Sequence, residues 1–329
     1  METAPEMSGS QRQRPRALLI LGMHRSGTSA ATRVVNLLGA HIGANILLPG
    51  EGNLEGFWEH ADAVHTNHYL LQVLGRTWFD IRQLPKTWPQ HAISQKTVAY
   101  IKTLIKRDFD SYPLVAIKDP RMCLTAPVWI AAFEALGYEV QCLFVVRDPR
   151  EVADSLQARE KWPREPIFLL WAHYMAQGLL ATQQCRRSLI TYDQLLTDWR
   201  GTIHRVSDEL ALTWPNDTEA AAIDVDAFLH VGHRHHKVAA SNTEEKTFAD
   251  MPFFVAEFYA NCIAIADGRK TWSAVEQSAS TFTSIAELYT TYLNDLLAQH
   301  GAAESKMKEQ VQTFEKLLSS FVANAQAKP

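Results

Sequence analysis

The sequence predicts an α/β fold in which a parallel β-sheet is flanked by helices. Four short apolar runs have the length and composition of buried strands, at 17–21, 114–118, 140–146 and 188–192. Stretches with helical periodicity separate them, and strands that alternate with helices predict parallel pairing with right-handed crossovers. The 329 residues and the 47% hydrophobic content are enough for a large buried core.

The first strand and the turn after it form the most informative stretch. The run 17–21 leads into Gly22 and Gly27, and helical periodicity begins beside Gly27. A strand, a glycine turn and a helix in this order direct loop amides and a positive helix N-terminus at an anion. The spacing is close to that of a P-loop, but Thr28 stands where the motif has lysine, and Arg25 supplies the cation. The loop therefore predicts a phosphate-type ligand rather than ATP with magnesium.

The later elements continue the alternation. Helices are predicted at 26–38, 56–74, 93–108, 127–136, 151–159 and 165–186, and a further helix with Asp193 as its N-cap. Pro149 suits the first turn of the fifth helix, and Gly137 ends the fourth.

The alternation ends near residue 224, and the rest of the chain is predicted to be helical. Apolar stripes at 275–296 and 307–321 predict two helices that pack on the core or on each other, with an intermolecular coiled coil as the alternative. We divide the chain into a disordered tail (1–15), a P-loop domain (16–240) and a helical C-terminal extension (241–329) that packs on the core or mediates association.

Composition narrows the class of protein. A net charge of −4 argues against a general nucleic-acid-binding surface. The four cysteines form no CxxC pair and suit reduced thiols in the cytosol. No stretch approaches the roughly 20 apolar residues of a membrane span. We therefore expect a cytoplasmic protein without a membrane span.

Charged and polar side chains gather where the predicted strands end. Arg25, Lys118, Arg147 and Tyr192 lie at or just beyond the carboxyl ends of the four strands. Ligands of parallel sheets bind at that edge. Three cations at one edge predict a ligand with several negative charges.

Four local patterns together resemble the sulfotransferase family that uses 3′-phosphoadenosine-5′-phosphosulfate (PAPS). They are Gly22-Met23-His24-Arg25-Ser26-Gly27-Thr28-Ser29, Lys118-Asp119-Pro120-Arg121, Arg147-Asp148-Pro149-Arg150 with Ser155 following, and Tyr192-Asp193-Gln194-Leu195-Leu196. The second and third are similar to those of tyrosylprotein sulfotransferases, and the set also resembles bacterial-type sulfotransferase family proteins. The resemblance covers roughly residues 17–237 and implies the P-loop NTPase-like sulfotransferase fold.

The resemblance implies a site for each end of PAPS. The 5′-phosphosulfate would be held by the loop residues His24, Arg25, Ser26, Gly27, Thr28 and Ser29. Arg147 and Ser155 match the family's 3′-phosphate site, one at a strand end and the other on the second turn of the next helix. Tyr192 and Arg234 complete the expected nucleotide contacts, although the basic cluster around Arg234 would equally suit a solvated loop.

The implied chemistry is an in-line sulfuryl transfer that needs no metal. Lys118 matches the family's catalytic lysine, and Lys118 and Arg25 would stabilise charge on the leaving oxygen. Glu59 is the first candidate for the base, because the rings of Phe57 and Trp58 would desolvate it and raise its pKa. His60 is the second candidate. The alternative for Glu59 is a helix N-terminal residue that interacts with the helix dipole.

The acceptor is expected to be a hydroxylated glycan or metabolite, since Trp58, Trp78, Phe79 and Trp88 lie in loops beside the proposed base. Histidines 41, 60, 65 and 68 do not share one helix face, so we expect no metal site. A homodimer through the C-terminal helices is a further expectation. Two other functions stay open: a metal-dependent P-loop small-molecule kinase, and a non-catalytic nucleotide-binding or interaction protein.

Overall fold

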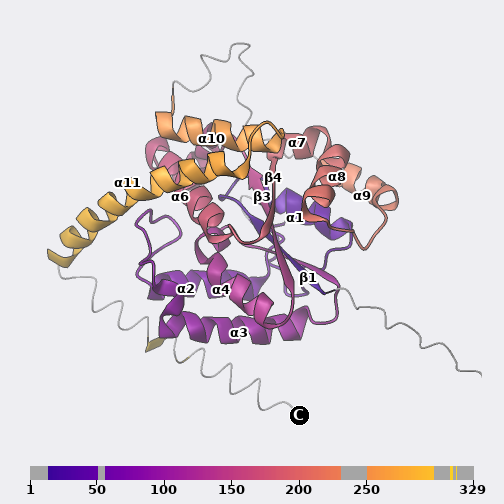
Figure 1. Ribbon diagram of the computed structural model, residues 1–329, viewed down its shortest axis with the longest axis horizontal. Coiled ribbons are helices and arrows are strands. Elements are labelled where there is room, and N and C mark those ends of the chain that lie inside the picture. The colour runs from indigo at the N-terminus through magenta and orange to yellow at the C-terminus, as the bar shows by residue number, and fades with distance from the viewer. Residues whose placement is uncertain (1–13, 51–55, 231–249, 300–311, 314–315, 317–329) are drawn as a thin grey trace, which may run out of the picture.

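The protein is a sheet covered by helices on both faces, as the ribbon of a computed structural model shows (Figure 1). The structure describes residues 14–50, 56–230, 250–299, 312, 313 and 316. Within these residues the predicted α/β architecture is confirmed.

The central sheet contains four strands that pair in parallel. They are β1 (Arg16–Leu21), β2 (Leu114–Lys118), β3 (Glu139–Val146) and β4 (Arg186–Thr191). The strands lie in the order β2-β1-β3-β4, so β2 lies on one side of β1, and β3 and β4 lie on the other. The crevice beyond the carboxyl end of β1 is therefore a topological switch point, where ligands of open α/β sheets bind.

The helices agree with the prediction in number and order from α1 to α7. Their bounds are α1 (Thr28–Leu37), α2 (Ala61–Val73), α3 (Ala92–Asp108), α4 (Met122–Ala135), α5 (Pro149–Glu160), α6 (Arg164–Ala181), α7 (Tyr192–Thr197), α8 (Trp199–Leu210), α9 (Thr218–His230), α10 (Phe253–Ala266) and α11 (Trp272–Gln299), with a 3-10 turn η1 (Trp88–Gln90).

The two faces of the sheet have separate hydrophobic cores. Alternate residues of a strand point to opposite faces. Leu18 and Ile20 of β1 therefore join a core with residues of α1, α8 and α9. Leu19 and Leu21 join the larger core with residues of α3, α4, α6, α10 and α11. All four side chains are fully buried, which fixes the register of the strand that leads into the glycine loop.

The start of α2 differs from the prediction. The helix begins at Ala61 and not at Gly56, because Gly56 (φ 99°) and Trp58 (φ 53°) lie in the left-handed region, which interrupts a right-handed helix. Residues 59–61 instead run beside residues 45–47. The amide of Leu47 donates to the carbonyl of Glu59 at 2.9 Å, and that of Ala61 to Asn45 at 2.8 Å.

Other helix bounds differ as well: α1 and α5 begin two residues from their predicted starts, and α6 ends at Ala181 rather than at 186. Helix α4 begins at Met122, five residues before the predicted start, and Pro127 lies inside it. Its first amides bond to carbonyls of the preceding turn, as Met122 N does to Asp119 O at 2.8 Å. The N-cap of α7 is Thr191 rather than Asp193, and Thr191 forms a capping box with Gln194.

The C-terminal helices α10 and α11 lie side by side over α6 (Figure 1). Val275 and Phe282 of the predicted stripe are buried in the larger core, whereas Ile285, Tyr289 and Tyr292 are exposed. The second stripe, 307–321, lies almost wholly outside the described residues, as does the proposed boundary at 240. The division into domains therefore stays a prediction.

A long loop between α2 and α3 is fastened to α11. The amide of Gln83 donates to Thr290 Oγ1 at 2.6 Å, and Lys86 Nζ lies 3.0 Å from Glu287 Oε1. The hydroxyl of Tyr174, on α6, donates to the carbonyl of Trp78 at 2.6 Å. The loop that carries Trp78 and Phe79 is thus held by α6 and α11 together.

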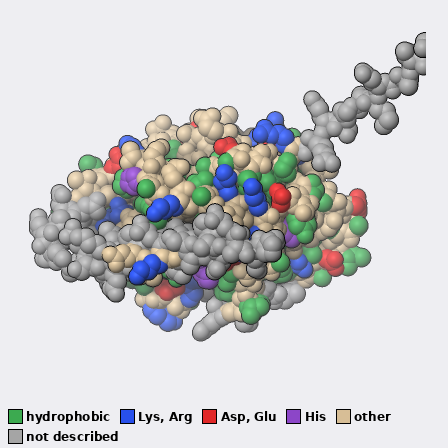
Figure 2. Space-filling view, turned by 90° about the horizontal axis from the view of Figure 1, so that it is seen from below, with side chains coloured by type: hydrophobic (Ala, Val, Ile, Leu, Met, Phe, Trp, Pro, Cys, Tyr) green, Lys and Arg blue, Asp and Glu red, His purple; other side chains and the backbone are tan. Residues whose placement is uncertain are grey.

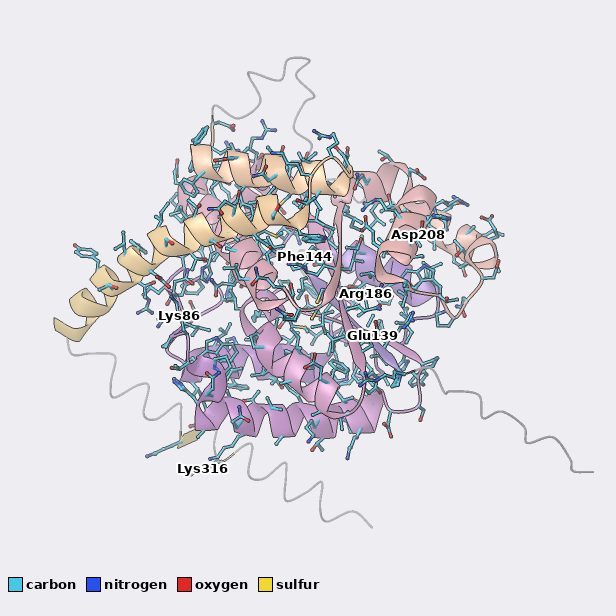
Figure 3. All side chains as sticks on the ribbon, in the orientation of Figure 1. Lys86, Glu139, Phe144, Arg186, Asp208 and Lys316 are labelled. Carbon is cyan, nitrogen blue, oxygen red and sulfur yellow. The ribbon has the colours of Figure 1, made fainter. Side chains whose placement is uncertain are left out.

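Glu139 and Arg186 lie near each other at the amino ends of β3 and β4 (Figure 3), and their charged atoms are 3.9 Å apart. The face drawn in Figure 2 shows Lys and Arg among acidic and hydrophobic side chains, without a continuous basic patch in its described part.

Among the described helices, none combines the length and apolar character that crossing a membrane requires.

Candidate active site

The loop between β1 and α1 is a tight turn with little spare room. Gly27 has φ 88°, and a Cβ placed there would lie 2.2 Å from Cδ2 of Tyr192. Arg25 also has a positive φ, 68°. The amide of Gly22 donates to Sγ of Cys123 at 3.2 Å, which ties the start of the loop to α4. The first amides of α1 have no carbonyl within the helix to bond, as at any helix N-terminus, so they can bind an anion.

Lys118, the last residue of β2, reaches the loop and the Glu59 segment at once. Its Nζ donates to Ser29 Oγ at 3.1 Å, to the carbonyl of Phe57 at 2.6 Å and to Glu59 Oε1 at 2.6 Å. The Lys118 side chain is 1% exposed and that of Glu59 11%. Lys118 and Glu59 are therefore a buried ion pair beside the glycine loop.

The other two predicted cations, Arg25 and Arg147, contact each other at the loop. Arg25 Nε donates to Ser155 Oγ at 2.8 Å. Arg147 Nη1 donates to the carbonyl of Arg25 at 3.2 Å, and its guanidinium lies 5.2 Å from the ring centre of Tyr192. The structure thus brings Arg25, Lys118, Arg147, Ser155 and Tyr192 around one loop. Tyr192 is the first residue of α7 rather than the last residue of the strand before it, as the sequence predicted.

Burial sets the protonation behaviour of this centre. Burial lowers the pKa of Arg25, and the nearby Arg159 and Arg147 lower it further. Burial raises the pKa of Glu59, although the Lys118 ammonium opposes that shift. A general base is most effective when its pKa lies near the working pH, so a raised pKa suits Glu59 to that role near neutral pH.

Several buried polar atoms of this region have no hydrogen-bond partner among the described residues. They are Ser26 Oγ, His24 Nε2, Arg121 Nε and Trp58 Nε1. Buried polar atoms without a partner are costly, and a ligand would satisfy them. Ser26 and His24 belong to the loop, and Trp58 lies between Phe57 and Glu59, which both contact Lys118. A phosphate-type oxygen bound at the loop would satisfy the Ser26 hydroxyl.

His24, a residue of the loop, lies beside the aromatic rings of Trp78 and Tyr174. Its ring is 4.7 Å from that of Trp78 and 5.6 Å from that of Tyr174. Burial, reinforced by Arg121 and other nearby cations, holds the pKa of His24 well below its ordinary value. The ring is therefore neutral at physiological pH.

The aromatic residues expected around the acceptor separate into three places. Trp78 stacks on Trp162 at 5.2 Å between ring centres, and Phe79, which is 51% exposed, meets both rings edge-on. Trp88 is buried in the core. Trp58 lies under the guanidinium of Arg33, 4.4 Å from its ring centre. Trp78, Phe79 and Trp162 together form an aromatic wall, of which Trp162 was not predicted from the sequence.

A buried hydrogen-bond network beside Lys118 contains one residue that the sequence did not predict, Asn67. Asp119 is fully buried and accepts from Arg121 Nη1 and Asn67 Nδ2, both at 2.9 Å. Asn67 Oδ1 in turn accepts from Thr125 and Trp129. Arg121 was visible as the last residue of the Lys-Asp-Pro-Arg pattern, whereas Asn67 left no signal because it lies 52 residues from Asp119.

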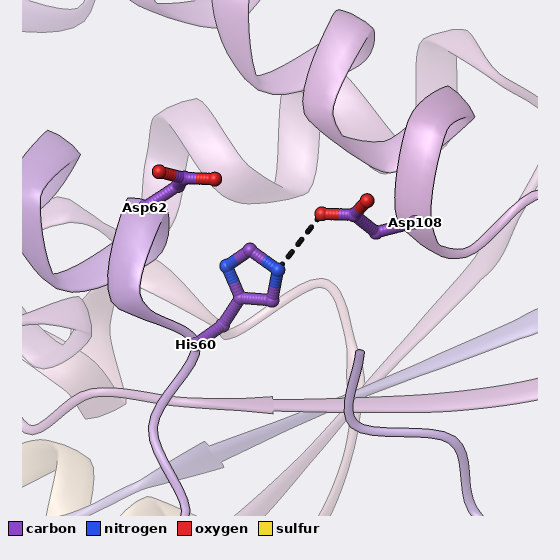
Figure 4. Close-up of side chains that lie close together, drawn as sticks. All are labelled: His60, Asp62 and Asp108. Carbon is purple, nitrogen blue, oxygen red and sulfur yellow. Dashed lines mark hydrogen bonds and ion pairs between the residues drawn. The ribbon is translucent and has the colours of Figure 1, made fainter. Parts of the chain in front are cut away.

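His60 does not join the cations at the loop. Its Nε2 bonds to Asp108 Oδ2 at 2.8 Å, and its ring lies 5.6 Å from that of Phe109. Figure 4 shows this bond, with Asp62 on the other side of the ring. Burial lowers the pKa of His60. Arg234 lies outside the described residues.

His60, Asp62 and Asp108 are the one group of described residues whose ligand atoms are close enough for a metal, within 4.8 Å of one another. Arg107 Nη2 already lies 2.5 Å from Asp62 Oδ2 and 2.6 Å from Asp108 Oδ2. A guanidinium therefore occupies the place between the carboxylates that a metal ion would take.

Comparisons with known proteins give likenesses of fold. No protein-family model and no curated protein sequence matches the chain. Among solved structures, the chain is similar to the sulfotransferase domain of the Synechococcus PCC 7002 olefin synthase, at 18% identity and a TM-score of 0.39 over 78% of this chain and 98% of that one.

The chain is also similar to the sulfotransferase domain of the curacin biosynthetic pathway, at 18% identity and a TM-score of 0.34 over 61% of this chain and 75% of that one. A third similar structure is retinol dehydratase in complex with androsterone and the inactive cofactor PAP, at 13% identity and a TM-score of 0.32 over 83% of this chain and 81% of that one. At these scores the likeness is one of fold, and the functional proposals rest on this chain's own residues.

Proposed function

We propose that the protein transfers the sulfuryl group of PAPS to a hydroxyl of a carbohydrate or small-molecule acceptor. The observation that carries the proposal is the meeting of Arg25, Lys118 and Arg147 around one glycine loop at the switch point of the sheet. PAPS supplies an activated sulfuryl group and two phosphate ends that need cations. Each end has a set of residues on this chain.

The loop and Lys118 would bind the 5′-phosphosulfate. The amides at the start of α1 and the unsatisfied Ser26 Oγ offer donors, and Lys118 Nζ lies within hydrogen-bond distance of Ser29. Charge that grows on the leaving oxygen during transfer would meet a preorganised ammonium in a buried setting, where electrostatic stabilisation is strongest. Lys118 and Arg25 are the groups we assign to that role.

Arg147 and Ser155 would bind the 3′-phosphate. Both contact Arg25: Arg147 donates to its carbonyl, and Ser155 accepts from its Nε. Arg147 uses its Nε for Glu151, at 2.8 Å, which orients the guanidinium. A rigidly held guanidinium and a hydroxyl suit a dianionic phosphate.

Glu59 would accept the proton of the acceptor hydroxyl. Its carboxylate lies 2.6 Å from Lys118, and burial raises its pKa. As the hydroxyl loses its proton to Glu59, that carboxylate becomes neutral and releases the ammonium of Lys118 for the leaving oxygen. The ion pair would thus couple the two ends of an in-line transfer.

The wall of Trp78, Phe79 and Trp162 supports an acceptor that contains a ring. Trp78 of the wall contacts His24 of the loop, and Phe79 is half exposed. Exposed aromatic faces suit sugars as well as phenols.

A cytoplasmic location, the absence of a metal and a homodimer through the C-terminal helices remain proposals.

Calorimetric titration with PAP and with AMP tests the proposed function. Wild-type protein should prefer PAP, and Arg147→Ala should lose about 1.5–3 kcal/mol of PAP binding, roughly 10- to 150-fold in Kd, with little change for AMP. Arg187→Ala is the matched control. The Arg187 side chain is 8% exposed, like the 9% of Arg147, but it pairs with Glu276 of α11. Equal affinity of the wild type for PAP and AMP would refute the proposal.

A further inference from the structure

The short segment that carries Glu59 has two anchors on opposite sides. On one side Lys118 Nζ holds the carbonyl of Phe57 and the carboxylate of Glu59. On the other side the next residue, His60, is 1% exposed and bonded to Asp108 at the end of α3. Adjacent residues in extended backbone point to opposite sides, and His60 has φ −72° and ψ 122°.

The backbone around His60 is tied to β2, the strand that ends in Lys118. His41 pairs with the edge of β2 through bonds to Leu114 and Ala116, at 3.0 and 2.8 Å. The chain then runs to residues 45–47, which pair with residues 59–61. Lys118 and Glu59 are therefore both positioned by β2: Lys118 is its last residue, and Glu59 is connected to it through residues 41–47.

The His60 ring fits a space that glycine leaves open. A Cβ at Gly43, which has φ 86°, would lie 2.5 Å from Cδ2 of His60. The ring also contacts Phe109. Because the Asp108 carboxylate can only accept, the Nε2 of His60 carries the proton and donates it. The buried Nδ1 has no partner among the described residues.

Asp108 is itself fixed by the same arginine that binds the first turn of α2. Arg107 donates through Nε to Asp108 Oδ1 at 2.7 Å, and its Nη2 bonds to Asp108 and to Asp62. Asn45 Nδ2 also lies 3.3 Å from Asp62. The end of α3, the start of α2 and the 45–47 segment are thus joined around His60.

We propose that His60 is a positioning residue, which holds Glu59 against Lys118 through its bond to Asp108. The role of Glu59 in transfer rests on the proposed function, but the position of Glu59 does not. Arg107 provides the positive charge of the network, so no metal ion is needed for it. Losing the His60–Asp108 bond should let the 56–60 segment open and expose Lys118.

The experiment measures how fast Lys118 reacts with acetic anhydride, by mass spectrometry and relative to the exposed Lys86. Opening that is about 1.5 kcal/mol easier raises the labelling rate roughly tenfold, the effect we expect for His60→Ala and Asp108→Ala. His60→Gln keeps a donor at a similar place and should label like the wild type. Asp108→Asn keeps an acceptor oxygen, so its Lys118 labelling rate should lie between those of the wild type and Asp108→Ala. This variant takes the place of Asp108→Ala if that protein does not fold.

Glu276→Gln is the control for general destabilisation, because it weakens the ion pair of Arg187, distant in the fold on α11 and β4. It should lower the Tm without faster labelling of Lys118. Unchanged labelling in folded His60→Ala and Asp108→Asn would overturn the proposal. So would zinc that binds the wild type with one-to-one stoichiometry but not Asp62→Asn, because the three side chains would then be a metal site.

Once turnover is measured, a second readout separates positioning from proton transfer. Asp108→Asn should lower kcat with little change in the KM for PAPS, and His60→Gln should retain most of kcat. If His60→Gln abolishes turnover while Lys118 labels as in the wild type, His60 acts through its own proton and the positioning role is wrong. If the protein does not bind PAP at all, the labelling result still decides the role of His60.

Discussion

Replacing Lys118 by methionine tests whether Glu59 is a buried carboxylate held by a single cation. The charged atoms of the pair lie 2.6 Å apart, and the side chains are 1% and 11% exposed. Methionine keeps most of the apolar stem of lysine and removes its ammonium. In Lys118→Met, Glu59 stays buried without its nearest cation, so we expect its carboxyl to be protonated in the folded state.

The cost of that proton sets the size of the effect. For a carboxyl with an ordinary pKa of 4.5, protonation costs about 3.4 kcal/mol at pH 7 and about 1.4 kcal/mol at pH 5.5. The pKa of Glu59 is higher in the folded than in the unfolded state. The free energy of unfolding that Glu59 contributes is therefore full below the unfolded-state pKa and is lost as the pH rises through the folded-state pKa. Lys118→Met should thus lose up to about 3.4 kcal/mol of unfolding free energy at neutral pH, and about 2 kcal/mol less at pH 5.5.

Urea denaturation at the two pH values measures this loss. The double variant Lys118→Met/Glu59→Gln lacks the titrating carboxyl, so its unfolding free energy should differ from that of the single variant mainly at the higher pH. If the two variants show the same difference at both pH values, Glu59 is not a buried carboxyl of raised pKa. The assignment of Glu59 as the base would then be refuted.

Three further changes test the loop and its ligand. Gly27→Ala places a Cβ 2.2 Å from Cδ2 of Tyr192 at φ 88°. We expect a loss of about 1–3 kcal/mol in unfolding free energy, measured by thermal denaturation, and a loss of PAP binding, measured by calorimetry. Unaltered PAP binding would mean that the loop adapts to the added methyl group. Ser155→Ala removes the acceptor of the Arg25 Nε bond and should weaken PAP binding by about 1 kcal/mol, roughly fivefold, whereas an equal loss for AMP would place Ser155 away from the 3′-phosphate. EDTA should leave PAP binding and sulfuryl transfer unchanged because Thr28 stands where magnesium-nucleotide loops have lysine; magnesium-dependent turnover of ATP would favour the kinase alternative instead.

The sheet and its ligand edge could be predicted because their signals are local. Each strand is an apolar run that ends in a turn, and the observed bounds of β1 and β2 differ from the predicted ones by one residue or none. Since parallel strands end at one edge, placing Arg25, Lys118 and Arg147 at strand ends also predicted that they would meet. Their hydrogen bonds around the loop agree with that expectation.

The surroundings of Glu59 could not be predicted in the same way, because they depend on contacts between distant residues. The left-handed φ of Trp58 moves the start of α2, and nothing in the sequence near Trp58 signals it. His60 meets Asp108, 48 residues away, only because α3 ends there. Asn67 likewise supports Asp119 from another helix. Such contacts follow from tertiary packing rather than from periodicity.

The fastening of the 75–91 loop to α11 bears on how the chain can be shortened or recombined. Thr290 accepts the amide of Gln83 and itself bonds back to the carbonyl of Ala286 in its own helix. A protein cut before α11 would keep Arg25, Lys118 and Arg147 and yet release the tryptophan-bearing loop from one of its two supports. If this loop binds the acceptor, as proposed, then exchanging it with that of another chain would require that the loop and α11 be transplanted together.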